Sequence, residues 1–189
     1  MTDSHPPQPP TPSLQPPTPV LPILALFSAY DDALAWGIAR AEASWGRVAL
    51  RSRIFSFDQT AYYEATMGAG LKKQLVVFDR LFDPGELAAR KRQTIEWERA
   101  YAKEAAHRVE RPVNLDPGYL SEAKLVLAST KDRDHRIYIG EGIYAECTLY
   151  FHRGAWTCRP WTYPDFRTDA YREFLLEARQ YYRTIKARA

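Results

Sequence analysis

The amino-acid sequence predicts an α+β protein with a ferredoxin-like β-α-β-β-α-β core, extended by a short helix, a β-hairpin and a C-terminal helix. One observation is the order in which apolar runs typical of strands alternate with segments of helical spacing. A second is the final segment, whose apolar residues form a single helical stripe. We therefore expect helices on one face of a sheet and polar strand residues on its open face.

Length and composition are those of one globular domain. The chain has 189 residues and a formal net charge of +3, so its overall charge does not argue for nucleic acid. Cys147 and Cys158 are too few for a disulfide framework. No run of about 18 apolar residues predicts a membrane span. The N-terminus lacks the basic start and apolar core of a secretory signal, so a cytoplasmic location is expected.

The N-terminal stretch differs in composition from the rest of the chain. Residues 1–19 hold eight of the fourteen prolines, and such a segment cannot form a strand ladder or bury apolar surface. We predict a disordered, dispensable tail at 1–19 and a single α+β domain at 20–189. Binding of the tail to a proline-recognising partner is the alternative.

The predicted domain begins with a strand, a helix and two more strands. Residues 20–30 form a continuous apolar run typical of a buried strand. A helix follows, which Asp31 or Asp32 can cap and Gly46 ends. Residues 47–57 alternate apolar with basic side chains and predict a second strand. After an irregular stretch, residues 71–82 predict a third.

A strong helix start comes next, at Asp83-Pro84-Gly85-Glu86. The helix should run to about residue 106, with a row at i, i+4, i+7 and i+11 that mixes apolar and polar types. We interpret that row as a rim between core and solvent. It consists of Leu87, Lys91, Thr94 and Glu98.

The second half contains a strand within 107–115 and a short helix from Asp116-Pro117 to about residue 128. A β-hairpin then has strands at 135–139 and 143–151, and residues 156–166 form an aromatic loop. The last helix has a core-facing stripe. The stripe consists of Tyr171, Phe174, Leu175, Ala178, Tyr182 and Ile185.

The hairpin register is predictable because side chains alternate faces along a strand. A three-residue loop, 140–142, pairs Tyr138 with Tyr144 and Arg136 with Glu146. It places one apolar and one polar face on the hairpin, with His135 on the apolar side. In the second strand, five residues should share the apolar face: Ile143, Ala145, Cys147, Leu149 and Phe151.

Basic side chains gather where this hairpin begins. The run Lys131-Asp132-Arg133-Asp134-His135-Arg136 leads into the polar face, and arginine and lysine bind phosphate or carboxylate groups. The alternative is that Arg136 simply pairs with Glu146. Known catalytic motifs are missing from the sequence: it has no phosphate-binding GxxxxGK[ST] or GxGxxG run, and no HExxH or CxxC that would hold zinc. We therefore predict no metal site.

Several longer runs identify a family. RPVNLDPGYL, LASTK, HRIYIGEGIYAECTL, WTYPDF and FDQTAYYEATMG resemble the bacterial family called domain of unknown function 4416, over roughly residues 23–182. The resemblance implies a single conserved domain and no established activity. Where the family reads FDYTDYYE, this chain has Ala61 in place of an acid, which argues against a metal there. The implied signature residues are Asp58, Tyr63, Glu64, Met67, Gly68, Arg111, Asn114, Asp116, Gly118, Tyr119, Lys131, His135, Arg136, Tyr138, Glu146, Trp161, Tyr163 and Asp165.

Three functions fit these residues. The first is binding, or turnover, of a small anionic ligand, nucleotide-like or phosphorylated. The second is RNA binding through exposed aromatics of a ferredoxin-like sheet, and the third is a structural or interaction role for a buried polar network. The sequence names no cofactor, reaction or oligomeric state and leaves open whether the protein is an enzyme. Ligand-binding candidates are Arg111, Asn114, Asp116, Lys131, Arg136, Tyr138, Tyr144, Trp161 and Tyr163, and catalytic candidates are Asp58, Glu64, His135 and Glu146.

Overall fold

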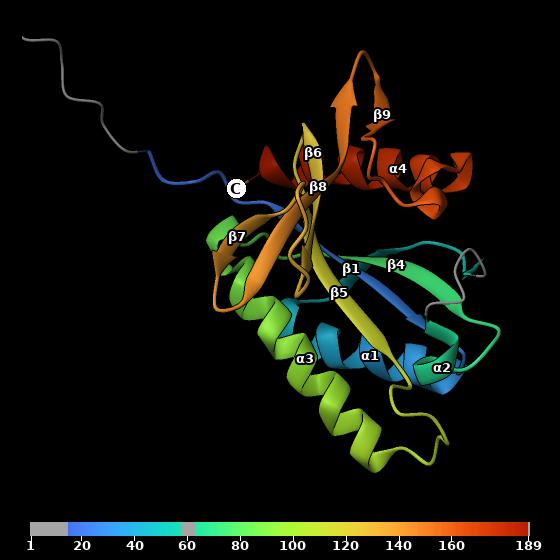
Figure 1. The fold of residues 1–189 in the computed structure, drawn as a ribbon. Coiled ribbons are helices and arrows are strands. Elements are labelled where there is room, and N and C mark those ends of the chain that lie inside the picture. Colours follow the sequence, from blue (N-terminus) through green and yellow to red (C-terminus); the bar gives the residue numbers. More distant parts are fainter. Residues whose placement is uncertain (1–14, 58–62, 189) are drawn as a thin grey trace, which may run out of the picture.

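The fold is an α+β arrangement around one nine-stranded sheet (Figure 1). The computed structural model describes residues 15–57 and 63–188. The strand order is β2-β4-β1-β5-β6-β8-β7, while β3 pairs with β4 and β9 with β8, and each of these pairings is antiparallel. The strands are β1 (Leu21–Ser28), β2 (Val48–Arg51), β3 (Phe55–Ser56), β4 (Lys72–Phe78), β5 (Asn114–Leu120), β6 (Lys124–Ser129), β7 (Ile137–Gly140), β8 (Ile143–His152) and β9 (Ala155–Cys158).

Helices cover both faces of this sheet. Figure 1 shows α1 and α3 on one side and α4 on the other, so the prediction that all helices share one face is wrong. The reason lies in the sheet, because its strands carry buried apolar residues on both faces. The helices are α1 (Asp31–Trp45), α2 (Glu64–Met67), α3 (Leu87–Glu104) and α4 (Asp169–Lys186), with 3-10 turns η2 (Pro84–Glu86) and η3 (Pro164–Arg167).

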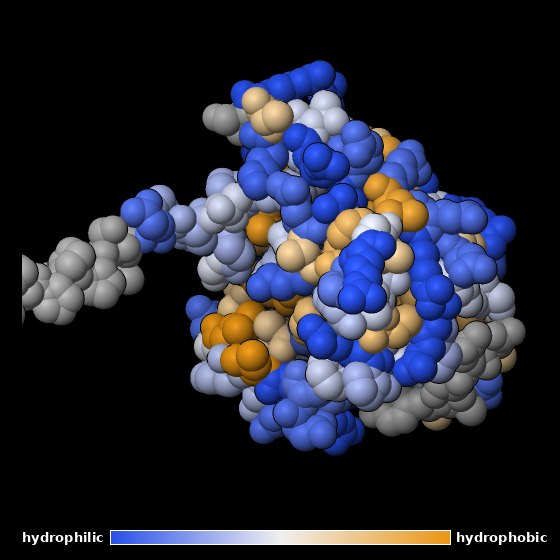
Figure 2. Space-filling view, turned by 90° about the horizontal axis from the view of Figure 1, so that it is seen from above, coloured by the Kyte–Doolittle hydropathy of each residue, from blue (hydrophilic) through white to orange (hydrophobic). Residues whose placement is uncertain are grey.

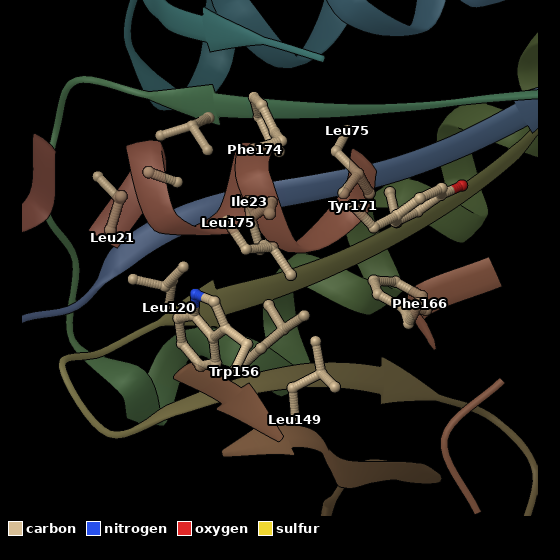
Figure 3. Packing of buried hydrophobic residues seen from close by; sticks show 14 of the residues in the cluster. Leu21, Ile23, Leu75, Leu120, Leu149, Trp156, Phe166, Tyr171, Phe174 and Leu175 are labelled. Carbon is tan, nitrogen blue, oxygen red and sulfur yellow. The ribbon is translucent and has the colours of Figure 1, made fainter. Parts of the chain in front are cut away.

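The first strand explains the two cores. Every residue of β1 is buried. Leu24 and Leu26 pack with α1 and α3, whereas Leu21 and Ile23 pack with α4. A strand buried on both faces has no polar alternation, which is why its sequence is a continuous apolar run. Figure 3 shows the core beneath α4, where Tyr171, Phe174 and Leu175 lie against Leu21, Ile23, Leu75 and Leu120.

The short helix predicted at 116–128 is wrong, because this segment forms β5 and β6. Pro117 suggested a helix start, but it lies inside β5, opposite Leu24 of β1. The ladder between β5 and β6 covers only Gly118 to Leu120 on the β5 side. Pro117 therefore occupies the part of β5 that has no paired neighbour on its second side, where a missing N–H costs no ladder hydrogen bond.

Gly118 marks the closest approach of these two strands. A Cβ atom at this position would lie 2.2 Å from the carbonyl oxygen of Val126 and 2.6 Å from Leu127 Cδ2. We expect Gly118→Ala to lower the free energy of unfolding by about 1–3 kcal/mol, because the strands must separate to admit the methyl group. Chemical denaturation measures this. An unchanged midpoint would show that β6 can move away from β5 without loss.

The register of the β7–β8 hairpin is as predicted in its first part. Ile137 pairs with Ala145, and Tyr138 with Tyr144. The loop differs, because Gly140 pairs with Ile143 across an irregularity and the predicted three-residue loop shortens to 141–142. Both loop residues have positive φ, 55° and 76°, which suits a tight two-residue turn, and the irregularity in β7 absorbs the extra residue.

A second irregularity changes which way β8 faces. Leu125 of β6 pairs with Leu149, whereas the next residue, Val126, pairs with Cys147. Thr148 is thus an extra residue in β8, and side chains before and after it lie on opposite faces. The prediction that the apolar residues of this strand share one face is therefore wrong beyond Cys147.

At the N-terminal end, Val20 bridges to Phe82, and Tyr182 of α4 donates a hydrogen bond to the carbonyl of Pro19 at 2.8 Å. The expected tail, 1–19, lies largely outside the described residues.

Within residues 15–57 and 63–188, no helix combines the length and apolar character needed to cross a membrane.

Candidate functional site

The site lies on the sheet face that α4 covers only in part. Residues directly opposite in antiparallel strands share a face. The register places Lys73 of β4 opposite Phe27, and Phe27 opposite Asn114 of β5. Likewise Leu127 of β6 lies opposite Glu146 of β8, and Ser129 shares the face of Leu127 two residues further along β6. Polar side chains from four strands are therefore brought to the same face, beyond the end of the apolar core under α4.

A cavity of about 110 Å³ opens over these residues. Its walls come from the sheet, from α3 through Lys91, and from the segments before α2, before β5, after β6 and before α4. Seven predicted ligand-binding or catalytic candidates line it; they are Arg111, Asn114, Asp116, Lys131, Arg136, Glu146 and Tyr163. The sequence motifs thus converge on one place, although they are far apart in the chain.

Other candidates lie elsewhere. Glu64 is exposed, and Asp58 lies outside the described residues. Tyr138 and Tyr144 form an edge-to-face pair with ring centroids 5.4 Å apart. The residues lining the cavity do not include these tyrosines, His135 or Trp161.

Lys91 is the centre of the cavity's best-connected group. This side chain comes from α3, on the other side of the sheet, and is 3 % exposed. Its ammonium donates to Asp116 Oδ1 at 2.7 Å and to the carbonyl of Leu115 at 2.9 Å, with Glu98 Oε1 at 4.0 Å. It can reach Asp116 because β5 and β6 are unpaired at this level.

Arg111 is held by the same group. Its Nε and Nη2 donate to Glu98 Oε2 at 3.2 and 2.8 Å, and Nη2 also donates to Asn114 Oδ1. Asn114 in turn donates to Asp116 Oδ2 at 2.7 Å. Glu98 Oε1 accepts from the backbone N–H of Leu115 at 2.7 Å. Each charged group therefore has a partner of opposite charge and a fixed orientation.

These contacts set the protonation of Asp116. Burial by itself would raise its pKa, but the ammonium of Lys91, the amide of Asn114 and the charge of Arg111 hold the pKa of Asp116 below its usual range. For Arg111, burial would lower the pKa, but the carboxylate of Glu98 raises it above the ordinary value. Asp116 is consequently an anion at neutral pH and accepts hydrogen bonds.

The hairpin residues form a second group. Arg136 donates from Nε to Glu146 Oε2 at 2.9 Å, and from Nη1 to Ser129 Oγ at 2.8 Å and the carbonyl of Lys131 at 3.0 Å. His135 was expected on the apolar side, but its Nε2 lies 3.2 Å from Glu146 Oε2. Since β7 begins only at residue 137, His135 lies outside the strand, and the alternation of faces does not determine the direction of its side chain. Its ring stacks on Trp161, 5.1 Å between centroids.

Lys73 supplies another buried cation. Its ammonium lies 2.5 Å from Asp165 Oδ2, and both side chains are buried. The ring centroids of Phe57 and Phe166 lie 4.9 and 4.5 Å from it. An ion pair and two aromatic faces thus fix this lysine at the cavity wall.

Sequence reasoning missed Lys73, Lys91 and Glu98 as site residues. A signal existed for two of them, because Lys91 and Glu98 belong to the row on α3 that we interpreted as a rim. That interpretation is wrong, since Lys91, Thr94 and Glu98 are 3 %, 0 % and 8 % exposed. A buried polar row on a helix implies that partners lie opposite, and here those partners are on β5.

Comparison with known families covers most of the chain. The model of the family described as "Domain of unknown function (DUF4416)" matches residues 18–182. The chain belongs to the DUF4416 family. No curated protein and no solved structure matches this DUF4416 chain. Within its described residues, no group of three or more His, Cys, Asp or Glu is placed to hold a metal ion.

Proposed function

We propose that this DUF4416 protein binds a small ligand through an oxyanion, such as a phosphate or carboxylate group, in the cavity beside β5 and β6. The observation that carries the proposal is the charge of the cavity wall. Among the described residues, five cationic side chains line the cavity against four carboxylates: Asp116 and Glu146 on the cavity wall, and Glu98 and Asp165 as ion-pair partners of the lining cations. The cationic residues are Lys73, Lys91, Arg111, Lys131 and Arg136.

The two arginines support this proposal through their geometry. Within the described part of the chain, Arg136 uses Nε and Nη1 in hydrogen bonds and Arg111 uses Nε and Nη2. One terminal nitrogen of each guanidinium keeps its donor capacity. Side chains that are already held in place lose little entropy when they bind a ligand group.

The size of the cavity limits the ligand. Pockets for drug-sized molecules span about 300–1,000 Å³, whereas this cavity measures about 110 Å³. The site therefore suits an oxyanion and a few attached atoms. A larger ligand would extend past the exposed ring of Tyr163 into solvent.

We also infer that the first part of the chain follows the ferredoxin-like plan. The order β2-β4-β1-β5, with α1 and α3 on the same side, supports it. RNA-binding proteins of this plan use an open sheet face. Here α4 packs on that face, and the Tyr138–Tyr144 pair lies at the edge of the sheet. No observation therefore favours RNA binding.

The test is the affinity of the full chain for inorganic phosphate, measured by calorimetry and by thermal shift. Lys131 is the variant of choice because it is exposed and lines the cavity. We expect Lys131→Met to weaken phosphate binding about tenfold, since it removes a charge-assisted contact, and to leave stability nearly unchanged.

Lys124→Met is the matched control. Lys124 is also an exposed lysine, but it lies at the opposite end of β6 and does not line the cavity. The proposal fails if phosphate and sulfate leave the wild type unshifted, or if Lys124→Met weakens binding as much as Lys131→Met does.

A further inference from the structure

Asp116 has a position that simple anion binding does not explain. It lines the cavity with five cations, and its side chain is 32 % exposed. Glu146, the other carboxylate, is 5 % exposed and is enclosed by Arg136, His135 and Thr148. Asp116 is therefore the one carboxylate of the described cavity wall that a ligand can reach.

An accessible carboxylate repels an oxyanion. It is useful in such a site only if the ligand brings a hydrogen-bond donor to it. A carboxylate has about four lone-pair positions, and the side chains of Lys91 and Asn114 occupy one each. Asp116 thus keeps room for a ligand's donor.

The charge of the cavity determines which kind of hydrogen-bond donor the ligand can bring to Asp116. An ammonium group on the ligand would face the repulsion of the surrounding lysines and arginines. A hydroxyl is neutral and avoids it. The aromatic rings of Phe57, Tyr63 and Phe166 line the same cavity and offer apolar surface to the carbon skeleton that carries the hydroxyl.

We infer that the ligand is a phosphorylated hydroxyl compound, of the kind found in sugar phosphates and in ribonucleotides, and that Asp116 accepts a hydrogen bond from its hydroxyl group. This inference rests on the proposed function, which supplies the oxyanion subsite. It adds the second subsite and the class of ligand. Asp116 binds rather than reacts, because a carboxylate that holds its proton so weakly is a poor base.

The experiment compares ligands that differ only in hydroxyl groups. Calorimetry on the full chain gives dissociation constants for propyl phosphate, which has none, and for glycerol 3-phosphate, which has two on the same carbon chain. We expect glycerol 3-phosphate to bind about tenfold more tightly or better, as one hydrogen bond to a charged acceptor allows.

Asp116→Asn should affect the affinities for the two ligands differently. Glycerol 3-phosphate should lose most of its advantage, because the acceptor becomes neutral. Propyl phosphate should bind as tightly as before or more tightly, because a repelling charge is removed. General damage to the site would weaken both. Asp116→Glu keeps a negative charge near Lys91 but displaces the carboxylate. It should reduce the affinity advantage of glycerol 3-phosphate without raising the affinity for propyl phosphate.

Two controls complete the design. Asp169→Asn changes a carboxylate that is 91 % exposed on α4 and should alter neither affinity. Lys131→Met should weaken the binding of both ligands by the same factor. Ribose 5-phosphate and adenosine monophosphate then separate the two sources of the hydroxyl, because the better ligand of this pair shows whether a free sugar phosphate or a nucleotide fits.

The inference is overturned if propyl phosphate and glycerol 3-phosphate bind the wild type equally, or if their affinity ratio is unchanged in both Asp116 variants. In either case, if phosphate binding is still weakened by Lys131→Met, the proposed oxyanion-binding function remains supported. Absence of any phosphate binding to the wild type overturns both together.

Discussion

Replacing Arg136 by methionine should lower the free energy of unfolding by about 3–5 kcal/mol, the usual loss when one partner of a buried ion pair is removed. The side chains of Arg136 and Glu146 are 6 % and 5 % exposed. Without the guanidinium, the Glu146 carboxylate stays buried and keeps, among the residues that the structure describes, the contacts with His135 and Thr148. Denaturant titration at neutral pH measures the loss. Arg136→Lys should recover only part of it, since one ammonium cannot reproduce the three contacts of the guanidinium.

A double-mutant cycle separates a structural pair from a binding residue. Glu146→Gln should restore stability in the Arg136→Met background, because no unpaired carboxylate remains. Simple additivity of the two losses would mean that the pair is not coupled. If the coupling is found and no phosphate compound shifts the wild type, the cluster is a structural network.

The chain offers a matched exposed pair as control. Arg92 Nη1 lies 2.6 Å from Glu141 Oε2, and both side chains are more than half exposed. Exposed ion pairs contribute little to stability because water screens them. Arg92→Met should therefore leave the unfolding midpoint almost unchanged. A loss as large as that of Arg136→Met would refute burial as the cause.

The second large effect is expected at Lys91. Lys91→Met keeps most of the length of the unbranched side chain but removes a cation that is 3 % exposed. It leaves the carbonyl of Leu115 without this donor and Asp116 and Glu98 without this cation. We expect a loss of about 3–5 kcal/mol, measured by denaturant titration. Asp116→Asn in the same background should recover part of it.

The stability that Lys91→Met loses relative to the wild type should become smaller in acid. Since the folded state holds the pKa of Asp116 below its usual value, Asp116 contributes stability above the unfolded pKa of about 3.9 and loses it as pH falls through the folded pKa. The difference between wild type and Lys91→Met should therefore shrink below about pH 4. A difference that grows in acid would contradict the assigned contact. Lys72→Met, which removes an exposed pair with Asp31, is the control.

Local patterns in the sequence were sufficient for part of the site. The alternation of side chains in the part of the hairpin before the bulge at Thr148 placed Tyr138 opposite Tyr144 and brought Arg136 to Glu146, because both strands belong to one hairpin. The helix start at Asp83 was equally local, since its side chain accepts from the N–H of Gly85 two residues later.

Other features depend on contacts between distant segments. Lys73 meets Asp165 across 92 positions of the chain and Lys91 meets Asp116 across 25. No spacing rule connects such pairs. The bulge at Thr148 had no sequence signal either, yet it decides that Leu149 packs under α4.

The long helices and main strands of the first half, the family and the basic cluster before the hairpin were predictable without the fold, because periodicity, helix starts and motifs are properties of neighbouring residues. The short helix α2 and the division of residues 47–57 into β2 and β3 were not. Three features are visible only in the folded chain: α4 covers the opposite face of the sheet, residues 116–128 pair as strands, and Lys91 contacts Asp116 across the sheet. These features follow from strand pairing and packing among remote segments, where burial and the partners available outweigh the local preference of any residue.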